Sequence, residues 1–269
     1  MPELPEVETT RNGIAPFLCE QAIESIVIRQ NSLRWPVSEQ LYSIQNVVVN
    51  EVLRRGKYII LCFSKGSILI HLGMSGSLRV VESTKLPEKH DHIDFVLCSG
   101  KIIRFNDPRR FGCVLWADKW QDHKLISSLG PEPLTSNFTP TYLFQEAKNK
   151  KLAIKQFIMN SKVVVGVGNI YANEALFLAG IHPEKAAGVV SKKKMALLVE
   201  NIKVVLTKAI EQGGTTLKDF VGSDGKPGYF QQALLVYGRS GKACHQCEGI
   251  LLEIRQNNRS TVYCKNCQK

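Results

Sequence analysis

The sequence predicts an α+β protein with an N-terminal antiparallel β-sandwich, a helical middle part and a small cysteine-rich module at the C-terminus. Between about 24 and 117, short runs of β-branched residues recur at close spacing, which is typical of an antiparallel sandwich. After 131 the apolar residues instead recur at helical spacing. Two Cys-x2-Cys pairs then close the chain. We therefore expect three domains in the 269 residues: 1–130, 131–234 and 235–269.

A helix is expected directly after the first residues, because Pro5 suits a first helical turn and Val7, Ile14 and Leu18 share an apolar face. Strands are expected at 26–28, 58–61, 68–70, 78–81, 92–96 and 101–105, with Ser99-Gly100 as a hairpin turn.

Gly130-Pro131-Glu132-Pro133 is expected to link the β-rich part to the helical part. The expected helices are 140–149, 151–159, 169–178 and 191–212. Ser191 is a candidate N-cap, and Gly213-Gly214 ends the last of these helices. The glycine-rich residues 215–229 are expected to form a loop, and a loop of this length is either functional or mobile.

The charge is unevenly distributed along the chain. The net charge is +11, and residues 1–130 hold 16 Lys and Arg against 14 Asp and Glu, whereas residues 131–269 hold 19 against 10. A polyanionic partner gripped by the second half explains this pattern, although a generally basic surface also would. No run approaches the ~20 apolar residues of a membrane span, and the N-terminus lacks the apolar core of a signal peptide. We expect a cytoplasmic protein without a membrane partner.

The spacing of four cysteines predicts one structural zinc ion. Each Cys-x2-Cys pair places two thiolates on one tight turn, and two such turns complete a closed tetrahedral site. The expected ligands are Cys244, Cys247, Cys264 and Cys267. The segment is too short to fold around a core of its own, so metal binding would supply its folding energy. The other cysteines are predicted to be buried free thiols: Cys19, Cys62, Cys98 and Cys113.

Between the cysteine pairs, residues 249–254 and 260–263 are expected to form two short strands, with 255–259 as the tip of a hairpin. Arg259 at such a tip suits insertion into a nucleic-acid groove, and a solvated turn is the alternative.

The N-terminus carries a possible nucleophile. If Met1 is removed, Pro2 begins the chain with a free secondary amine, and an α-amino group titrates near ~8. Attack of this amine on an aldehyde-like carbon gives a cationic iminium, as lysine Schiff bases do. Glu3 places a carboxyl group beside it for proton transfer. An ordinary terminus would have the same sequence, because proline at position two is common.

Two turns between predicted strands, 71–76 and 107–112, carry Met74 and Phe111. Apolar side chains at loop tips can act as wedges between stacked bases, with Arg109 filling the gap or pairing with an orphan base. Ordinary loop packing is the alternative for each turn. Lys57 could contact phosphate or assist proton transfer, or be a solvated lysine.

The glycine-rich turn at 165–171 opens a helix and could clamp a phosphate with Asn169 as donor, or pack two helices together. It lacks the G-x-G-x-x-G pattern and a strand-helix-strand context, so we exclude dinucleotide binding.

Taken together, these motifs resemble those of the bacterial formamidopyrimidine-DNA glycosylase family along essentially the whole chain. The matching segments are Pro-Glu-Leu-Pro-Glu at 2–6, His-Leu-Gly-Met-Ser-Gly at 71–76, Asp-Pro-Arg-Arg-Phe-Gly at 107–112, Gly-Val-Gly-Asn-Ile-Tyr at 166–171, Gln-Gly-Gly-Thr-Thr at 212–216 and the terminal zinc finger. Leu4 favours this branch over the endonuclease VIII-like branch, which tends to start Pro-Glu-Gly-Pro-Glu and prefers oxidised pyrimidines.

The resemblance implies a bifunctional DNA glycosylase and AP lyase that removes 8-oxoguanine and formamidopyrimidines, the ring-opened purines, in base excision repair. It implies a β-sandwich with flanking helices, then a helix–two-turn–helix domain and a zinc-finger hairpin. The implied partner is damaged double-stranded DNA. We expect a monomer associated with the bacterial nucleoid, and neither Mg²⁺ nor a nucleotide as cofactor.

The resemblance also implies residue roles. Pro2 would be the Schiff-base nucleophile and Glu3 the general acid and base, while Lys57 would assist β-elimination and Arg259 the final δ-elimination. The residues implied to fill the space left by the flipped nucleotide are Met74, Arg109 and Phe111. Further implied DNA contacts are His90, Lys150, Lys155 and Asn169.

Three other functions are compatible with parts of the sequence. A pyrimidine-directed glycosylase of the same superfamily would share its motifs. A lesion- or RNA-binding module would need the basic half and the hairpin but not the amine. A small-molecule tautomerase that uses an N-terminal proline would leave the zinc hairpin and the basic half unexplained.

Overall fold

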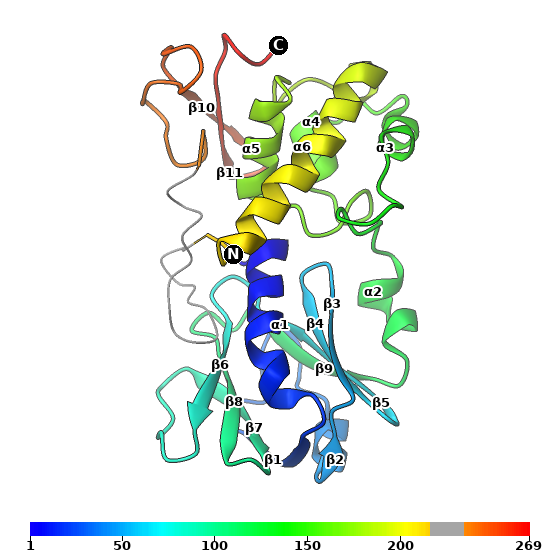
Figure 1. Ribbon diagram of the computed structural model, residues 1–269, viewed down its shortest axis with the longest axis vertical. Coiled ribbons are helices and arrows are strands. Elements are labelled where there is room, and N and C mark those ends of the chain that lie inside the picture. Colours follow the sequence, from blue (N-terminus) through cyan, green and yellow to red (C-terminus); the bar gives the residue numbers. More distant parts are fainter. Residues whose placement is uncertain (216–233) are drawn as a thin grey trace. The chain divides into compact units, whose positions relative to one another are not determined.

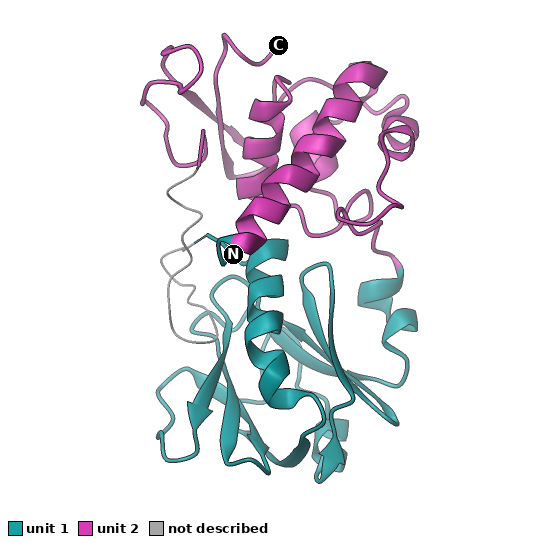
Figure 2. Cartoon of the chain, in the orientation of Figure 1, with its two compact units in different colours: residues 1–127, 212–229 teal, residues 128–211, 230–269 magenta. Residues whose placement is uncertain are grey.

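The computed structural model describes residues 1–215 and 234–269, which belong to two compact units (Figure 2). Within the described residues, the first unit comprises 1–127 and 212–215 and the second comprises 128–211 and 234–269. The predicted α+β class is confirmed, with the two larger antiparallel sheets in the first unit and most of the helices, together with a two-stranded antiparallel sheet, in the second (Figure 1). Of the predicted loop 215–229, only Thr215 lies within the described residues.

The first unit is an antiparallel sandwich of two sheets. The five-stranded sheet has the order β2 (Val47–Val48), β1 (Ala22–Ile28), β7 (Asp91–Leu97), β8 (Lys101–Asn106), β6 (Ser77–Glu82). The four-stranded sheet has the order β3 (Glu51–Arg55), β4 (Tyr58–Phe63), β5 (Gly66–His71), β9 (Cys113–Ala117). Alternate side chains of both sheets share one core, among them Phe95 and Phe105 from one sheet and Ile59 and Leu61 from the other. Each such buried side chain contributes about 1.5 to 3 kcal/mol.

Helix α1 (Leu4–Leu18) begins where the sequence predicts it. Glu3 is its N-cap, and Glu3 and Glu6 form a reciprocal capping box that satisfies two backbone N–H groups. Val7, Ile14 and Leu18 are buried in the sandwich core, so the predicted apolar face is confirmed. The short α2 (Lys124–Ser127) and the 3-10 helices η1 (Glu39–Ile44) and η2 (Trp120–Asp122) complete the regular elements described in this unit.

The second unit contains the four predicted helices: α3 (Pro140–Ala147), α4 (Ile154–Ile158), α5 (Asn169–Leu178) and α6 (Lys192–Glu211). A 3-10 helix, η3 (Ala187–Val189), precedes α6. The predictions for α3 and α4 were too long, since α3 ends two residues early and α4 begins after Ala153. Ser191 Oγ accepts the Lys194 N–H at 3.3 Å, as expected of an N-cap. Gly213 and Gly214 follow α6 with φ of +73° and +81°, which ends the helix.

The C-terminal hairpin is tighter than predicted. Strands β10 (Leu252–Gln256) and β11 (Arg259–Tyr263) pair Gln256 with Arg259, so only Asn257 and Asn258 form the turn. Both have positive φ, 47° and 59°, as a two-residue type I′ hairpin turn requires. The predicted five-residue tip is therefore wrong, because Arg259 is the first residue of β11 and flanks the turn.

The prediction of four buried free thiols is correct for Cys113 alone. Cys19 and Cys62 are half-buried, and Cys98 is exposed because it follows the last residue of β7 at the hairpin turn. In the described part of the chain, no helix combines the length and the apolar character that a membrane crossing needs.

Candidate functional site

The N-terminal residues are held tightly at the start of α1. Pro2 and Glu3 are buried, with Glu3 only 2% exposed. The Glu3 N–H donates to Glu6 Oε2 at 2.8 Å, and the Glu3 side chain accepts from the backbone N–H of Glu6. The other carboxylate oxygen of Glu6 accepts the Thr215 N–H at 2.8 Å. This arrangement fixes the side chain of Glu3, the residue that follows Pro2. The Pro2 nitrogen is an amide while Met1 is present.

The two predicted wedge turns present apolar side chains to solvent. Met74 is 37% exposed and Phe111 is 46% exposed. The Arg109 guanidinium lies 5.0 Å from the centre of the Phe111 ring, so the two side chains of this turn form a cation–π contact.

A cavity of about 560 Å³ connects these turns with the N-terminus. Its lining residues are Met1, Leu33, Arg34, His71, Gly73, Met74, Arg110 and Phe111. The first unit thus brings the start of the chain and two of the predicted wedge residues to one cavity. A group bound there would meet apolar surface and two guanidinium groups.

Lys57 lies with Gly56 in the two-residue turn between β3 and β4. Together with burial, the positive charge of its ammonium group lowers the pKa of His71, which lines the cavity. Burial, with the charges of Lys57 and Arg34, lowers the pKa of His71 to about 4, so the imidazole is neutral near pH 7. His71 Nδ1 accepts the Gly73 N–H at 2.9 Å, which leaves the ring proton on Nε2.

His90, another predicted DNA contact, joins the second wedge turn through its backbone. Its carbonyl accepts the Asp107 N–H at 3.1 Å, and its ring centre lies 6.4 Å from that of His92. Of the predicted site residues in the first unit, Met74 and Phe111 line the cavity and Arg109 contacts the Phe111 ring, whereas Pro2, Glu3, Lys57 and His90 are not among the lining residues.

In the second unit, two predicted DNA contacts hold the zinc hairpin. Lys155 is only 1% exposed, and its Nζ donates to the Ser260 carbonyl at 2.9 Å and to Thr261 Oγ1 at 2.6 Å. Asn169 Nδ2 donates to the same Ser260 carbonyl at 3.0 Å. Lys155 lies in α4 and Asn169 begins α5, so both helices hold Ser260, the residue that follows Arg259. Lys150 is exposed in the segment between α3 and α4.

The glycine-rich turn at 165–171 is a packed element. Val165 and Val167 are 2% exposed, and Gly168 is the N-cap of α5. Asn169 Oδ1 is buried without a hydrogen-bond partner, whereas its Nδ2 is used on the hairpin. The turn thus packs the helices and also aims Asn169 at β11.

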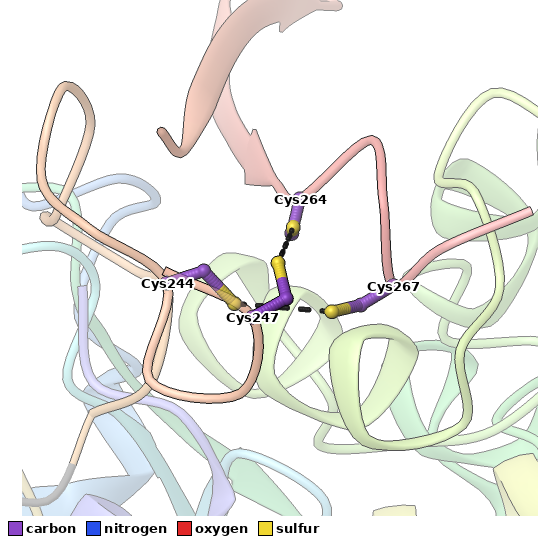
Figure 3. Close-up of side chains that lie close together, drawn as sticks. All are labelled: Cys244, Cys247, Cys264 and Cys267. Carbon is purple, nitrogen blue, oxygen red and sulfur yellow. Dashed lines mark hydrogen bonds between the residues drawn. The ribbon is translucent and has the colours of Figure 1, made fainter. Parts of the chain in front are cut away.

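The four predicted cysteines form one cluster (Figure 3). Their Sγ atoms all lie within 4.8 Å of one another, with Cys244 and Cys267 3.9 Å apart and Cys247 and Cys264 3.4 Å apart. A tetrahedral zinc ion with ~2.3 Å bonds to sulfur separates its ligands by about 3.8 Å. The cluster fits one structural zinc ion.

Sequence reasoning missed several residues that shape these sites. His71 and Asp107 were quoted only as parts of the two turn motifs, although each is the first residue of its motif. Glu174 was not singled out, yet its buried carboxylate accepts the backbone N–H groups of Leu235, Val236 and Tyr237 at 2.8 to 2.9 Å. The available signal was the pair Asn173-Glu174, which interrupts an otherwise apolar helix sequence.

The sandwich with its exposed apolar turns, the helical unit and the hairpin with four clustered thiolates define a two-unit α+β zinc-finger protein. Family models match nearly the full chain: the formamidopyrimidine-DNA glycosylase N-terminal domain at 1–114, the formamidopyrimidine-DNA glycosylase H2TH domain at 129–221 and the zinc finger found in FPG and IleRS at 241–269. The chain belongs to the formamidopyrimidine-DNA glycosylase family, which confirms the resemblance read from its motifs.

Known relatives support this assignment over their whole length. The chain is 56% identical to the formamidopyrimidine-DNA glycosylase of Photobacterium profundum and 55% identical to that of Shewanella woodyi, covering 100% of this chain and 100% and 99% of the relatives. The Thermus thermophilus MutM (Fpg) structure matches with a TM-score of 0.90 and 33% identity, over 99% of this chain and 98% of that one. Lactococcus lactis Fpg, solved in complex with DNA containing an abasic site, matches with a TM-score of 0.92 and 31% identity over 99% of both chains. The chain is therefore a DNA glycosylase of base excision repair.

Proposed function

We propose that the chain, once Met1 is removed, excises 8-oxoguanine and formamidopyrimidines from double-stranded DNA and then cleaves the strand by β,δ-elimination. One observation carries this proposal: the start of the chain lines the same cavity as Met74 and Phe111. A lesion cannot be reached inside the duplex, and flipping it out costs a few kcal/mol of stacking. Met74, Arg109 and Phe111 would fill the gap and offset that cost.

The covalent steps use the Pro2 amine. Its lone pair attacks the sugar C1′, the glycosidic bond breaks, and the damaged base leaves with its electron pair and takes up a proton. The sugar ring then opens: the C1′–O4′ bond breaks, O4′ takes up a proton, and the nitrogen lone pair forms the C1′=N⁺ iminium. This iminium acidifies the C2′ proton. Loss of that proton expels the 3′ phosphate, and a second elimination expels the 5′ phosphate. Glu3, held by the capping box, would transfer the protons. Lys57 would assist the first elimination.

The second unit would bind the duplex and complete the strand cleavage. Arg259 flanks the hairpin turn and would serve δ-elimination, with Lys155 and Asn169 holding its neighbour Ser260. Lys150, Asn169 and, from the first unit, His90 would contact phosphates. We propose a monomer that acts on damaged DNA in the bacterial cytoplasm at the nucleoid.

Borohydride trapping tests the nucleophile. Reduction of the iminium on an 8-oxoguanine duplex should leave a covalent protein–DNA adduct with processed protein, and none with protein that retains Met1. Glu3→Gln should still bind the lesion but lose about 100-fold or more in base excision. Glu24→Gln, at an exposed position of β1, is the matched control and should behave as wild type. Excision by Glu3→Gln at the wild-type rate would remove the proton-transfer role.

The choice of lesion is tested separately. Duplexes with 8-oxoguanine and with thymine glycol should be cleaved at different rates, the former faster. Preferential cleavage of thymine glycol would replace this proposal with the pyrimidine-directed alternative.

A further inference from the structure

Asp107 lies where the two wedge turns meet, and it is fully buried. Its side chain faces the turn that carries Met74, while its own turn carries Arg109 and Phe111. The described contacts of the first unit give this one carboxylate three hydrogen-bond donors from both turns.

The two carboxylate oxygens divide these donors between them. Oδ1 accepts the Ser75 hydroxyl at 2.8 Å and the Arg109 N–H at 3.3 Å. Oδ2 accepts the Gly112 N–H at 2.8 Å. Ser75 directly follows Met74, and Arg109 and Gly112 bracket Phe111 on either side. Each wedge residue is therefore at most one residue from a bond to Asp107.

The backbone of Asp107 extends the same network to the predicted DNA contact His90. The Asp107 N–H donates to the His90 carbonyl at 3.1 Å, and the Asp107 carbonyl accepts from the Arg110 N–H at 3.2 Å. His92 Nε2 lies 2.8 Å from the same carbonyl. Because a carbonyl oxygen only accepts, this His92 nitrogen carries the ring proton.

The turns are also packed against each other through their backbones. A Cβ atom on Gly73 would lie 2.4 Å from the Gly112 nitrogen and 2.5 Å from the Phe111 carbonyl carbon. Arg110 has a positive φ of 54°, which an arginine adopts only when its surroundings hold it there. The backbones of the two turns are therefore in close contact at Gly73 and Gly112.

We propose that Asp107 is a positioning residue that joins the two turns into one rigid wedge. This inference rests on the proposed function of Met74, Arg109 and Phe111. Asp107 is too deeply buried to meet DNA itself, so it acts only through these residues. Opening of the duplex at the lesion should depend on Asp107, whereas the amine chemistry of Pro2 should not.

Asp107→Asn is the sharpest variant, because it keeps the shape but turns one acceptor into a donor. Whichever way the amide is oriented, it faces at least one N–H or O–H group that loses its partner. Ser75→Ala removes a single donor and leaves the carboxylate intact. Ser77→Ala is the matched control, since Ser77 is 5% exposed against 4% for Ser75 and lies two residues further along.

Two measurements distinguish the opening of the duplex by the wedge residues from the amine chemistry of Pro2. The fluorescence of 2-aminopurine beside 8-oxoguanine reports base unstacking in the duplex. Borohydride trapping on a single-stranded abasic oligonucleotide reports the Pro2 amine without any base to extrude. Asp107→Asn should slow both unstacking and single-turnover excision in the duplex about 10-fold to 100-fold, and Ser75→Ala about 3-fold to 10-fold. Both variants should trap the single-stranded abasic site within about 2-fold of wild type, and Ser77→Ala should match wild type throughout.

The proposal is overturned if Asp107→Asn unstacks the duplex at the wild-type rate, or if it loses trapping on the single strand to the same extent. If Asp107→Asn does not fold, the proposal is rejected when Ser75→Ala unstacks the duplex at the wild-type rate. Failure of wild-type protein to trap the single-stranded abasic site would instead reject the proposed Pro2 chemistry, and the unstacking rates would still decide the role of Asp107.

Discussion

The His71 imidazole shows how neighbours decide the charge of a single side chain. Burial disfavours the imidazolium, and the positive charges of Lys57 and Arg34 disfavour it further. The hydrogen bond from the Gly73 N–H also needs an unprotonated Nδ1. All of these effects keep a second positive charge away from the cavity where the iminium would form. The first unit should consequently be sensitive to acid at this residue.

This sensitivity can be measured. The folded pKa of His71 is about 4 and the unfolded value is about 6.5, so only the unfolded state binds a proton as pH falls between them. The contribution of neutral His71 to the free energy of unfolding is therefore fully present above pH 6.5 and is lost progressively as the pH falls toward 4. His71→Gln should reduce the loss of unfolding free energy between pH 7.5 and pH 5 by about 1 to 2 kcal/mol. Urea unfolding followed by tryptophan fluorescence reports the first unit, which holds Trp35, Trp116 and Trp120. Equal pH dependence in both proteins would contradict the assignment.

At the scale of elements, regular patterns could be predicted and close contacts could not. Helix α6 has a cap, an apolar period and a glycine stop, so its limits followed from local residues. The tip of the hairpin was misjudged because the residues around it are polar and show no alternation. The Asn257-Asn258 pair was nevertheless a readable signal, since asparagine tolerates positive φ. The contact between the two wedge turns had no local signal, because it joins backbones more than thirty residues apart.

The turn contact is testable with a pair of glycines. Gly73 and Gly100 both have positive φ, +67° and +80°, so an added Cβ strains both by about 1 to 2 kcal/mol. A Cβ on Gly73 also collides with the 107–112 turn, whereas one on Gly100 meets nothing within 4 Å. Gly73→Ala should therefore lose about 10-fold or more in excision from a duplex, and Gly100→Ala should stay within about 2-fold of wild type. Single-turnover excision measures both, and equal losses would show that backbone strain alone is responsible.

At the scale of the whole molecule, the uneven charge predicted a polyanionic partner, and the spacing of the two cysteine pairs predicted a zinc ion. The excess positive charge lies in residues 131–269, the half that carries the helices and the zinc hairpin. The cysteine spacing was sufficient because two tight turns leave thiolates few other arrangements. Buried polar pairs such as Ser75 with Asp107, or Lys155 with Thr261, could not be predicted, because tertiary packing alone brings them together. The three-part division at 130 and 234 stays a prediction.

The zinc ion should stabilise more than its own hairpin. Cys244 and Cys264 share a small core with Val262 and with Phe177 of α5, so loss of the metal should loosen that helix as well. Cys247→Ser should abolish stoichiometric zinc binding and raise hydrogen exchange in 235–269 and α5, while the sandwich strands stay protected. Duplex affinity should fall about 10-fold or more, since Arg259 and its supports lose their fixed positions. Cys98→Ser makes the same chemical change at another exposed thiol outside the cluster and should alter neither zinc content nor exchange. If Cys247→Ser kept one zinc ion per chain and wild-type affinity, the four-thiolate site would not be the element that orders the hairpin.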